Sequence, residues 1–321
     1  MRNQAEETRM ITRRCLVSGA ATVSAMLIQP AQSQGVGKIR IGYTAVLDYT
    51  AAFVAQEEGF FRRQGLETEL QLIPLNSTLP AALQSNSIQI GGPTPSVMIS
   101  AVDGGLDLVA LTACAEITRE VTTFGVVVKT GSDVQDATGF VGKRVGVPGL
   151  NAFLHVLFRK WLMDKGVDPR RVTFVEVAFP QMADVLRGGT VDAVVTGEPV
   201  LSRIVASSTG RLVSNMTPEL AEPLPTALWA TTRAWATRNP DAIRGFRSAI
   251  AEAVAWTGSN SDKAREYIAK YTRLPIEIVR TVPLARLRSD VTQRELEAWV
   301  RIMTEQDMLT SKIDAARLRL A

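Results

Sequence analysis

The chain has 321 residues, of which 46% are hydrophobic and 21% charged, a balance typical of a globular protein with one large or two medium-sized domains. Its formal net charge is only +4, and half of that charge lies in the first 33 residues. No lysine- and arginine-rich block or basic stripe interleaved with aromatic residues is present, which argues against nucleic-acid binding. The composition also excludes a disordered chain.

The N-terminus is predicted to be a targeting segment. Arg13 and Arg14 form a twin-arginine pair, a weakly apolar run follows over 16–28, and Ala31-Gln32-Ser33 has the small residues of a cleavage site. We therefore expect residues 1–33 to be a cleaved signal peptide of twin-arginine type, although a Sec signal can carry the same two arginines. No later segment has the ~20 consecutive apolar residues that a membrane span needs, so we expect an exported, soluble mature chain.

The first part of the mature chain alternates strand and helix patterns. In chain order, the patterns predict a strand over 39–41, a loop over 43–49, a helix over 52–60, strands over 66–72 and 88–90 separated by a short helix over 77–83, a helix over 97–102, a strand over 108–111 and a polar loop over 114–123. Thr94 and Ser96 place two hydroxyls between a strand and a helix. Open α/β sheets bind their ligands at this carboxyl end of the strands.

One stretch combines a strand over 144–147, the turn Pro148-Gly149 and an amphipathic helix that ends at Gly166. Asn151 is the expected N-cap of this helix. A strand that enters a helix through a glycine turn directs free backbone N–H groups and the positive end of the helix dipole at one spot. The stretch is therefore a candidate seat for a carboxylate, sulfonate or phosphate oxygen. An ordinary βα unit with nothing bound shows the same pattern.

A second series of alternating elements follows, and the chain then becomes helical. Residues 126–128 are predicted to cross between domains, and the later elements are a strand over 172–177, a helix over 182–186 and a strand over 191–195. This spacing indicates parallel βαβ sheets. From about Trp229 onward we expect helices over 240–256, 262–270 and 277–282, and a last helix that begins with the capping box Thr292-Gln293-Arg294-Glu295. These helices need a sheet to cover.

Four short motifs occur in one order along the chain. They are AQEEGFFRRQGL at 55–66, GKRVGV at 142–147, LRGGTVDA at 186–193 and GEP at 197–199. Together they resemble the A-x-E-x-G-F-F-x-x-x-G-L, L-x-G-K-x-V-G-V, L-x-x-G-x-V-D-A and x-E-P motifs of periplasmic solute-binding proteins of ABC importers, of the aliphatic sulfonate, nitrate and taurine type. Phe140 stands where that family usually has leucine. The resemblance covers the chain from Ile39 to about Leu309.

The resemblance implies a type II periplasmic binding protein fold, with two α/β lobes joined by a two-strand hinge. It places residues 38–125 and 229–321 in lobe I and residues 126–228 in lobe II. Closure of the hinge would trap a small, anionic organic solute such as a sulfonate, nitrate or carboxylate in the periplasm and present a changed shape to the membrane permease of the ABC transporter. The resemblance also implies a monomer without a cofactor. A periplasmic sensor that presents its solute to a signalling receptor is the alternative.

Strand ends of lobe I supply the first candidate ligand-binding residues. Tyr49 lies on the loop after the first strand, where it could contact a solute or simply start a helix. Asn76 lies where the resembling proteins have a polar turn that faces the cleft. Thr94 and Ser96 offer more hydroxyls than helix capping requires. Arg119 could supply a counter-charge, but Glu120 beside it offers a surface ion pair instead.

Lobe II supplies the remaining candidates. Leu150, Asn151 and Ala152 would contribute backbone N–H groups and one amide, and they replace the commoner Gly-Ser-Ser type turn, which disfavours sulfonate and favours a larger or more apolar anion. His155, the only histidine, could be packed or solvated, or could meet an anion as a protonated ring. That hypothesis predicts weaker binding above about pH 7.5. Glu198 could line the cleft and bind an amine or hydroxyl, or could pair structurally.

Enzyme functions find little support in the sequence. The chain has no G-x-S-x-G elbow, no phosphate-binding loop, no dinucleotide fingerprint and no cysteine and histidine cluster for a metal. With Cys114 as the only cysteine of the mature chain, no disulfide can form within it. A fungal pyrimidine-synthesis enzyme resembles the same family, but it has a cysteine-rich motif that is absent here. We therefore expect a binding protein rather than an enzyme.

Overall fold

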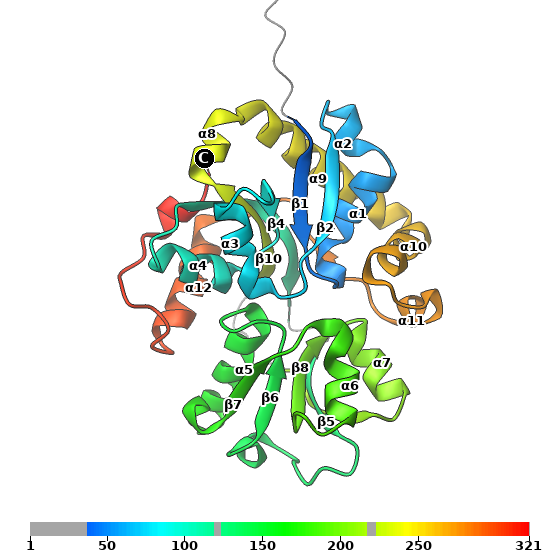
Figure 1. Ribbon diagram of the computed structural model, residues 1–321, viewed down its shortest axis with the longest axis vertical. Helices are drawn as coiled ribbons and strands as arrows, with labels where there is room; N and C mark the ends of the chain where they lie inside the picture. The colour runs from blue at the N-terminus through cyan, green and yellow to red at the C-terminus, as the bar shows by residue number, and fades with distance from the viewer. Residues whose placement is uncertain (1–36, 119–122, 217–222, 321) are drawn as a thin grey trace, which may run out of the picture. The chain divides into compact units, whose positions relative to one another are not determined.

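The computed structural model describes residues 37–118, 123–216 and 223–320. The predicted signal peptide and Arg119 lie outside these residues. The described strands form two separate sheets, one of six and one of five strands, and each sheet has its own helices (Figure 1). We call the six-stranded sheet with its helices the first lobe, and the five-stranded sheet with its helices the second lobe.

The sheet of the first lobe has the strand order β11-β4-β10-β3-β1-β2. Its strands are β1 (Ile39–Tyr43), β2 (Thr68–Leu72), β3 (Ile90–Gly91), β4 (Leu108–Ile117), β10 (Leu224–Thr232) and β11 (Arg286–Leu287). β1 pairs in parallel with β2 and β3, whereas β10 pairs antiparallel with β3 and β4. The prediction of parallel sheets is therefore wrong for this half of the sheet.

The long antiparallel pair β4 and β10 also corrects two predicted boundaries. The polar loop predicted from residue 114 begins later, since β4 continues to Ile117, and the helical region predicted from Trp229 is preceded by β10, which runs to Thr232. Both strands are buried along almost their whole length. A strand that is buried on both faces shows no alternation of polar and apolar residues, so its length cannot be seen in the sequence.

The sheet of the second lobe has the order β7-β6-β8-β5-β9. Its strands are β5 (Phe124–Lys129), β6 (Arg144–Val147), β7 (Thr173–Glu176), β8 (Ala193–Gly197) and β9 (Gly210–Ser214). β6 is parallel to β7 and β8, but β5 is antiparallel to both of its neighbours, β8 and β9. Residues 126–128, predicted as a crossing run, are thus part of an inner strand. β9 was not predicted.

The helices divide between the lobes. The helices of the first lobe are α1 (Thr50–Glu57), α2 (Phe60–Arg63), α3 (Leu79–Gln84), α4 (Pro95–Asp103), α8 (Arg233–Arg238), α9 (Pro240–Ser259), α10 (Ser261–Thr272), α11 (Ile276–Thr281) and α12 (Gln293–Thr304). On the five-stranded sheet lie α5 (Phe153–Asp164), α6 (Met182–Arg187) and α7 (Val200–Ala206). Short 3-10 helices, η1 (Leu47–Tyr49) and η2 (Asn76–Thr78), precede α1 and α3. In Figure 1 the late helices α8, α9 and α12 return to the strands of the first lobe.

Aromatic contacts attach the late helices to the first ones. Phe61 of α2 stacks on Phe246 of α9 at 5.6 Å between ring centroids, and Phe53 of α1 stacks on Tyr271 of α10 at 4.6 Å. The indole N–H of Trp299 in α12 donates to the carbonyl of Pro225 in β10. The capping box predicted for α12 is present, with both reciprocal bonds between Thr292 and Glu295. These contacts explain why a helical C-terminal region completes a lobe that the N-terminal strands begin.

The start of α5 differs from the prediction by one residue. The N-cap is Ala152, which makes no side-chain cap bond, while Asn151 lies in the left-handed region with a φ of 61°. Asparagine tolerates this conformation better than most residues. The predicted N-cap Asn151 thus ends the preceding turn, and the helix begins without a capping bond from the side chain of its own N-cap residue.

Candidate binding site between the two lobes

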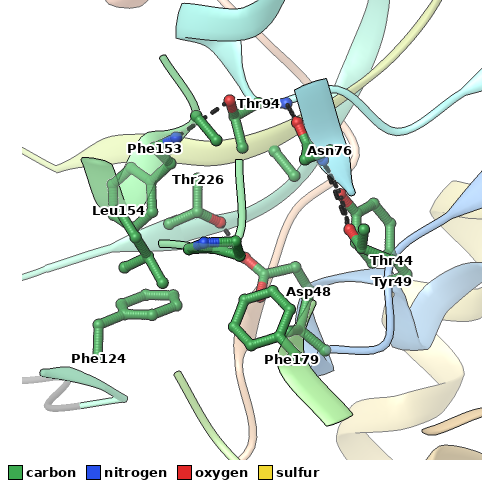
Figure 2. A pocket seen from close by; sticks show the side chains of 14 residues that line it. Thr44, Asp48, Tyr49, Asn76, Thr94, Phe124, Phe153, Leu154, Phe179 and Thr226 are labelled. Carbon is green, nitrogen blue, oxygen red and sulfur yellow. Dashed lines mark hydrogen bonds between the residues drawn. The ribbon is translucent and has the colours of Figure 1, made fainter. Parts of the chain in front are cut away.

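A cavity of about 40 Å³ lies between the lobes and is lined by both. The polar lining residues are Thr44, Asp48, Tyr49, Asn76, Thr94 and Thr226, all from the first lobe. The apolar lining residues are Val46, Phe124, Pro148, Ala152, Phe153, Leu154, Phe179 and Ala227. Figure 2 shows these side chains around the cavity. Since one water needs roughly 10–15 Å³ on this measure, the cavity holds only a few water-sized groups.

The polar residues of the first lobe are mostly bonded to one another. The hydroxyl of Tyr49 donates to the carbonyl of Gly92 at 2.5 Å and lies 3.1 Å from Thr44 Oγ1, while Asn76 Nδ2 donates to the same carbonyl at 3.0 Å. Asn76 Oδ1 accepts from the Thr94 N–H at 2.9 Å. The network fixes the ends of β1, β3 and η2 relative to each other. It leaves few of these donors for a ligand.

Hydrogen bonds also join the lobes at the edge of the cavity. The Phe153 N–H of α5 donates to Thr94 Oγ1 at 3.2 Å, as Figure 2 shows, and the Asn76 N–H donates to the carbonyl of Pro148 at 3.4 Å. Farther out, Gln306 Nε2 donates to the carbonyl of Val156 at 3.2 Å. The two lobes are therefore in direct contact around the cavity.

The N-terminal end of α5 supplies unused donors at this cavity. Phe153 N–H is taken by Thr94, and the first helical bond runs from Val156 N–H to the carbonyl of Ala152. The amides of Leu154 and His155 therefore have no acceptor among the described residues. Free N–H groups and the positive end of the helix dipole favour an electron-rich atom at this position. The predicted anion seat is thus part of the cavity wall through Ala152, Phe153 and Leu154.

Among the described lining residues, Asp48 is the one carboxyl group, and none of them is a lysine, arginine or histidine. The side chain is 6% exposed, and it accepts a short hydrogen bond from Thr226 Oγ1 of β10. Burial raises the pKa of the Asp48 carboxyl, and the bond from Thr226 and one from its own backbone N–H oppose that rise. Figure 2 shows Asp48 between Thr226 and the ring of Phe179.

Aromatic rings form the wall opposite the polar network. The rings of Phe124 and Phe153 meet edge to face at 5.0 Å, and Phe153 also contacts Trp299 of α12 at 5.8 Å. On the side of the polar network, the ring of Tyr49 meets Trp229 of β10 edge to face at 5.4 Å. Edge-to-face and stacked rings give a rigid apolar surface, which suits a flat or apolar solute body.

Four of the predicted site residues line the cavity: Tyr49, Asn76, Thr94 and Ala152. Ser96 is buried behind them, where its hydroxyl lies 3.2 Å from Thr94 Oγ1. The Ser96 hydroxyl therefore supports Thr94 and does not face the cavity.

Leu150 and Asn151 lie on the outer side of the same turn. They line a separate groove of about 640 Å³ with residues of α3 and α4, and Leu150 is 42% exposed. The Leu150 N–H donates to the Glu176 carboxylate at 2.6 Å, and the Asn151 N–H donates to His155 Nδ1 at 2.9 Å. Their backbone N–H groups are thus used within the protein.

His155 is buried, with 4% of its surface exposed, and its ring meets Phe174 edge to face at 4.4 Å. Burial, with a smaller contribution from the charge of Arg159, lowers the pKa of His155 to about 3. The ring is therefore neutral at pH 5.5–8. Of the two predicted alternatives, the structure has the packed ring and not the protonated one. His155 is not among the described lining residues of the cavity, which include Ala152, Phe153 and Leu154 of the same helix start.

Glu198 and Arg119 complete the predicted set. The Glu198 carboxylate accepts from Ser202 N at 3.1 Å and Ser202 Oγ at 2.8 Å, so it caps α7 and does not line the cavity. Burial raises the pKa of Glu198, and the bonds from Ser202 oppose that rise. Arg119 lies outside the described residues.

Several lining residues were not among the predicted ones. Phe124, Phe153 and Phe179 look like ordinary core residues in the sequence, and Thr226 lies in a strand that the sequence did not reveal. Asp48 lies beside Tyr49 on the predicted loop, and a charged residue between apolar ones there was an available signal.

Two classes of feature are absent from the described part of the chain. Over residues 37–118, 123–216 and 223–320, no group of three or more histidine, cysteine, aspartate or glutamate residues is placed to hold a metal ion. Over the same residues, none of the helices combines the length and apolarity of a membrane crossing.

The fold and the cavity define a two-lobed protein of the type II periplasmic binding protein class. The structure is similar to the alkanesulfonate-binding protein SsuA from Xanthomonas axonopodis pv. citri bound to MOPS, with a TM-score of 0.77 and 18% identity over 89% of this chain and 98% of that one. It is also similar to the periplasmic nitrate-binding protein NrtA from Synechocystis, with a TM-score of 0.72 and 15% identity over 87% and 84% of the two chains.

The sequence profile of the NMT1-like family matches residues 32–272, and the chain belongs to this family. It is 30% identical over 138 residues to the nitrate/nitrite binding protein NrtA from Synechococcus elongatus, which is 41% of this chain and 30% of that protein. It is 23% identical over 266 residues to the nitrate import ATP-binding protein NrtC from Synechocystis, which is 75% of this chain and 38% of that protein. The matches thus span well under half of either relative. The predicted fold class and family resemblance are confirmed.

Proposed function

We propose that this protein is the periplasmic solute-binding component of an ABC importer, that it is not an enzyme, and that it delivers a small organic solute to a membrane permease. The observation that carries the proposal is the cavity whose walls come from both lobes, closed by the bond from Phe153 N–H to Thr94 Oγ1. A site shared by two lobes exists only when they meet, so binding and closure are coupled. Similarity to sulfonate- and nitrate-binding proteins supports the same role.

The lobe boundaries belong to this proposal. We assign residues 38–118 and 224–320 to lobe I, the first lobe, and residues 124–216 to lobe II, the second lobe. The predicted boundaries at 125/126 and 228/229 each move by a few residues, because Phe124 and Gly125 belong to β5 and residues 224–228 belong to β10. A solute that bonds to Leu154 N–H of lobe II while it contacts the Thr94 region of lobe I would hold the lobes together. Release at the permease then requires that the cross-lobe contacts break, including the bonds of Thr94, Asn76 and Gln306.

The acceptor end of the solute is expected at the N-terminus of α5. A carboxylate, sulfonate or nitrate-like oxygen there would accept from the amides of Leu154 and His155, for which the described residues provide no acceptor. The charge of the helix end contributes typically 0.3–1 kcal/mol at exposed sites and up to about 2 kcal/mol when partly buried. This is enough to orient an anionic group but not to hold a bare ion alone.

A thermal-shift screen of residues 34–321 against sulfonates, nitrate, carboxylates and pyrimidines tests the proposal. A solute present at a hundred times its Kd stabilises the folded state by about 2.7 kcal/mol, which moves Tm by several degrees. The gain should fall in Thr94→Val, which removes the cross-lobe acceptor, and largely persist in Thr94→Ser. A complete lack of response over the panel would count against solute capture.

Uptake by cells separates the importer from other roles. Deleting the gene should abolish uptake of the solute that stabilises the protein, and restoring the gene should bring uptake back. Undiminished uptake in the deletion strain would refute the importer role while leaving solute binding intact.

A further inference from the structure

The cavity is lined by a carboxylate, Asp48, for which the described residues supply no charged partner. Asp48 is buried, and no described lysine or arginine forms an ion pair with it, since its bonds come from Thr226 and its own backbone. The other ionisable groups near Asp48 are the phenol of Tyr49 and the thiol of Cys114, which are both buried and neutral. Burial of an unpaired carboxylate destabilises a fold, so its presence in a ligand cavity calls for an explanation.

The hydroxyl of Thr226 positions this carboxylate and leaves part of it for the cavity. Thr226 Oγ1 is held between Asp48 and the carbonyl of Ala115, which lies 3.3 Å away. A carboxylate has about four lone-pair sites on two oxygens. One bond from Thr226 and one from its own backbone leave acceptor capacity directed at the cavity, where no described protein donor uses it.

The opposite wall has the complementary chemistry. The amides of Leu154 and His155 at the start of α5 are donors without acceptors, and Leu154 lines the same cavity as Asp48. The other polar lining groups, Tyr49 and Asn76, donate to Gly92. Among the described residues, the second lobe therefore offers the Leu154 and His155 amides as donors, and the first lobe offers the Asp48 carboxylate as an acceptor.

We propose that the solute recognised here carries both an acceptor oxygen for the α5 amides and an N–H or ammonium donor for Asp48, so that Asp48 selects small zwitterionic or amine-bearing solutes and rejects bare anions. This inference rests on the proposed function and names the solute class of that site. A bare anion would lie in a small cavity with a carboxylate and no cation among the described lining residues. A solute with a donor end satisfies the carboxylate and completes the bonds of both lobes.

Matched pairs of small probes test the inference by calorimetric titration at pH 7.5. The pairs are 2-aminoethanesulfonate with ethanesulfonate, β-alanine with propionate, and 4-aminobutyrate with butyrate. In each pair only the amino group differs, so the ratio of the two Kd values isolates the donor. We expect at least one pair in which the amino member binds the wild-type protein ten or more times more tightly than its partner.

Two variants test whether Asp48 causes the tighter binding of the amino-bearing probes. Asp48→Asn keeps the shape and the acceptor for Thr226 but removes the charge, and it should reduce the tenfold preference to near one. Asp262→Asn removes one negative charge at an exposed position of α10, far along the chain from the cavity residues, and should leave the preference unchanged. Because the wild-type pairs already measure the preference, the inference can be tested even if the Asp48 variant fails to fold.

Each contrary result has a separate meaning. Bare anions that bind the wild-type protein as tightly as their amino partners, or more tightly, would overturn the inference and leave solute capture standing. If Asp48→Asn still binds the amino member of a pair more tightly, the inference is also overturned, because another residue would then bind the amino group. If neither these pairs nor the broader panel of sulfonates, carboxylates and pyrimidines binds, both the inference and the proposed function fall.

Discussion

Acidification is expected to destabilise the wild-type protein more than a His155→Gln variant. His155 lies in the first turn of α5, where Nδ1 accepts the Asn151 N–H and the ring packs against Phe174. Because Nδ1 accepts, the neutral ring carries its proton on Nε2, which has no hydrogen-bond partner among the described residues. Protonation would place a charge in this apolar setting, and burial accordingly lowers the pKa of His155 to about 3.

The sign and size of the effect follow from linkage. The unfolded chain takes up a proton near the ordinary histidine value of 6.5, while the folded protein does not do so until the pH approaches 3. The contribution of His155 is therefore fully present above pH 6.5 and is lost as the pH falls through this window. The loss in the free energy of unfolding is about 2 kcal/mol at pH 5 and at most about 5 kcal/mol near pH 3. Local opening of the first turn of α5 would limit it further.

Urea unfolding of both proteins at pH 7.5, 6 and 5 measures the difference. All other titrating groups are shared, so the difference in the free energy of unfolding between wild type and variant should change by about 2 kcal/mol from pH 7.5 to pH 5. Parallel stability curves would show that His155 titrates normally and refute the reasoning. The same neutral ring predicts that solute affinity stays flat from pH 5.5 to 8.

Three further perturbations have directions fixed by the structure. Burial raises the pKa of Asp48, so folding favours its protonated form and the wild-type protein loses stability as the pH rises. Asp48→Asn should therefore be more stable than wild type at pH 7.5. This difference in stability should vanish below pH 3.8, the ordinary pKa of aspartate. Gly92→Ala would place a methyl group 2.2 Å from the ring of Tyr49 and should abolish solute binding in titrations. Thr292→Ala removes the capping box with Glu295 and should lower the free energy of unfolding by about 1 kcal/mol in urea.

Each of these three has a contrary outcome. An Asp48→Asn variant that is less stable than wild type at every pH would show that the carboxylate is well paired. Solute binding by Gly92→Ala at wild-type affinity would mean that the Tyr49 ring is free to move. Equal unfolding curves for Thr292→Ala and a Thr292→Ser control would show that the α12 cap contributes little.

Features that depend on neighbours in sequence were predictable. The capping box of α12, the hydroxyl pair Thr94 and Ser96, and the strand, turn and helix that end in α5 all rest on residues a few positions apart. Their physical causes, side-chain capping and amphipathic periodicity, act over one or two turns. The order of these motifs was also enough to identify the family and its two-lobed fold.

Features that depend on burial on two faces were not predictable in the same way. β4 and β10 form the longest strand pair of the first lobe, yet Thr112, Cys114 and Glu116 within β4 look like loop residues. Their setting is decided by β10 and β11, which lie more than a hundred residues later in the sequence. The antiparallel half of the sheet is therefore a tertiary property, and local pattern alone favours the parallel arrangement of its first strands.

The binding site also shows that local sequence patterns do not reveal contacts between distant residues. Tyr49 and Asn76 were chosen because they are polar and lie at strand ends, but the structure shows that both donate to Gly92. The carboxylate that stays available, Asp48, is held by Thr226, which lies 178 residues away. The number of polar residues near a cleft therefore does not predict how many polar groups can bind a solute, because some of them already bond within the protein. Because Asp48 lies in the first lobe and the amides of Leu154 and His155 lie in the second, the groups that we propose to bind the solute come together only when the two lobes meet.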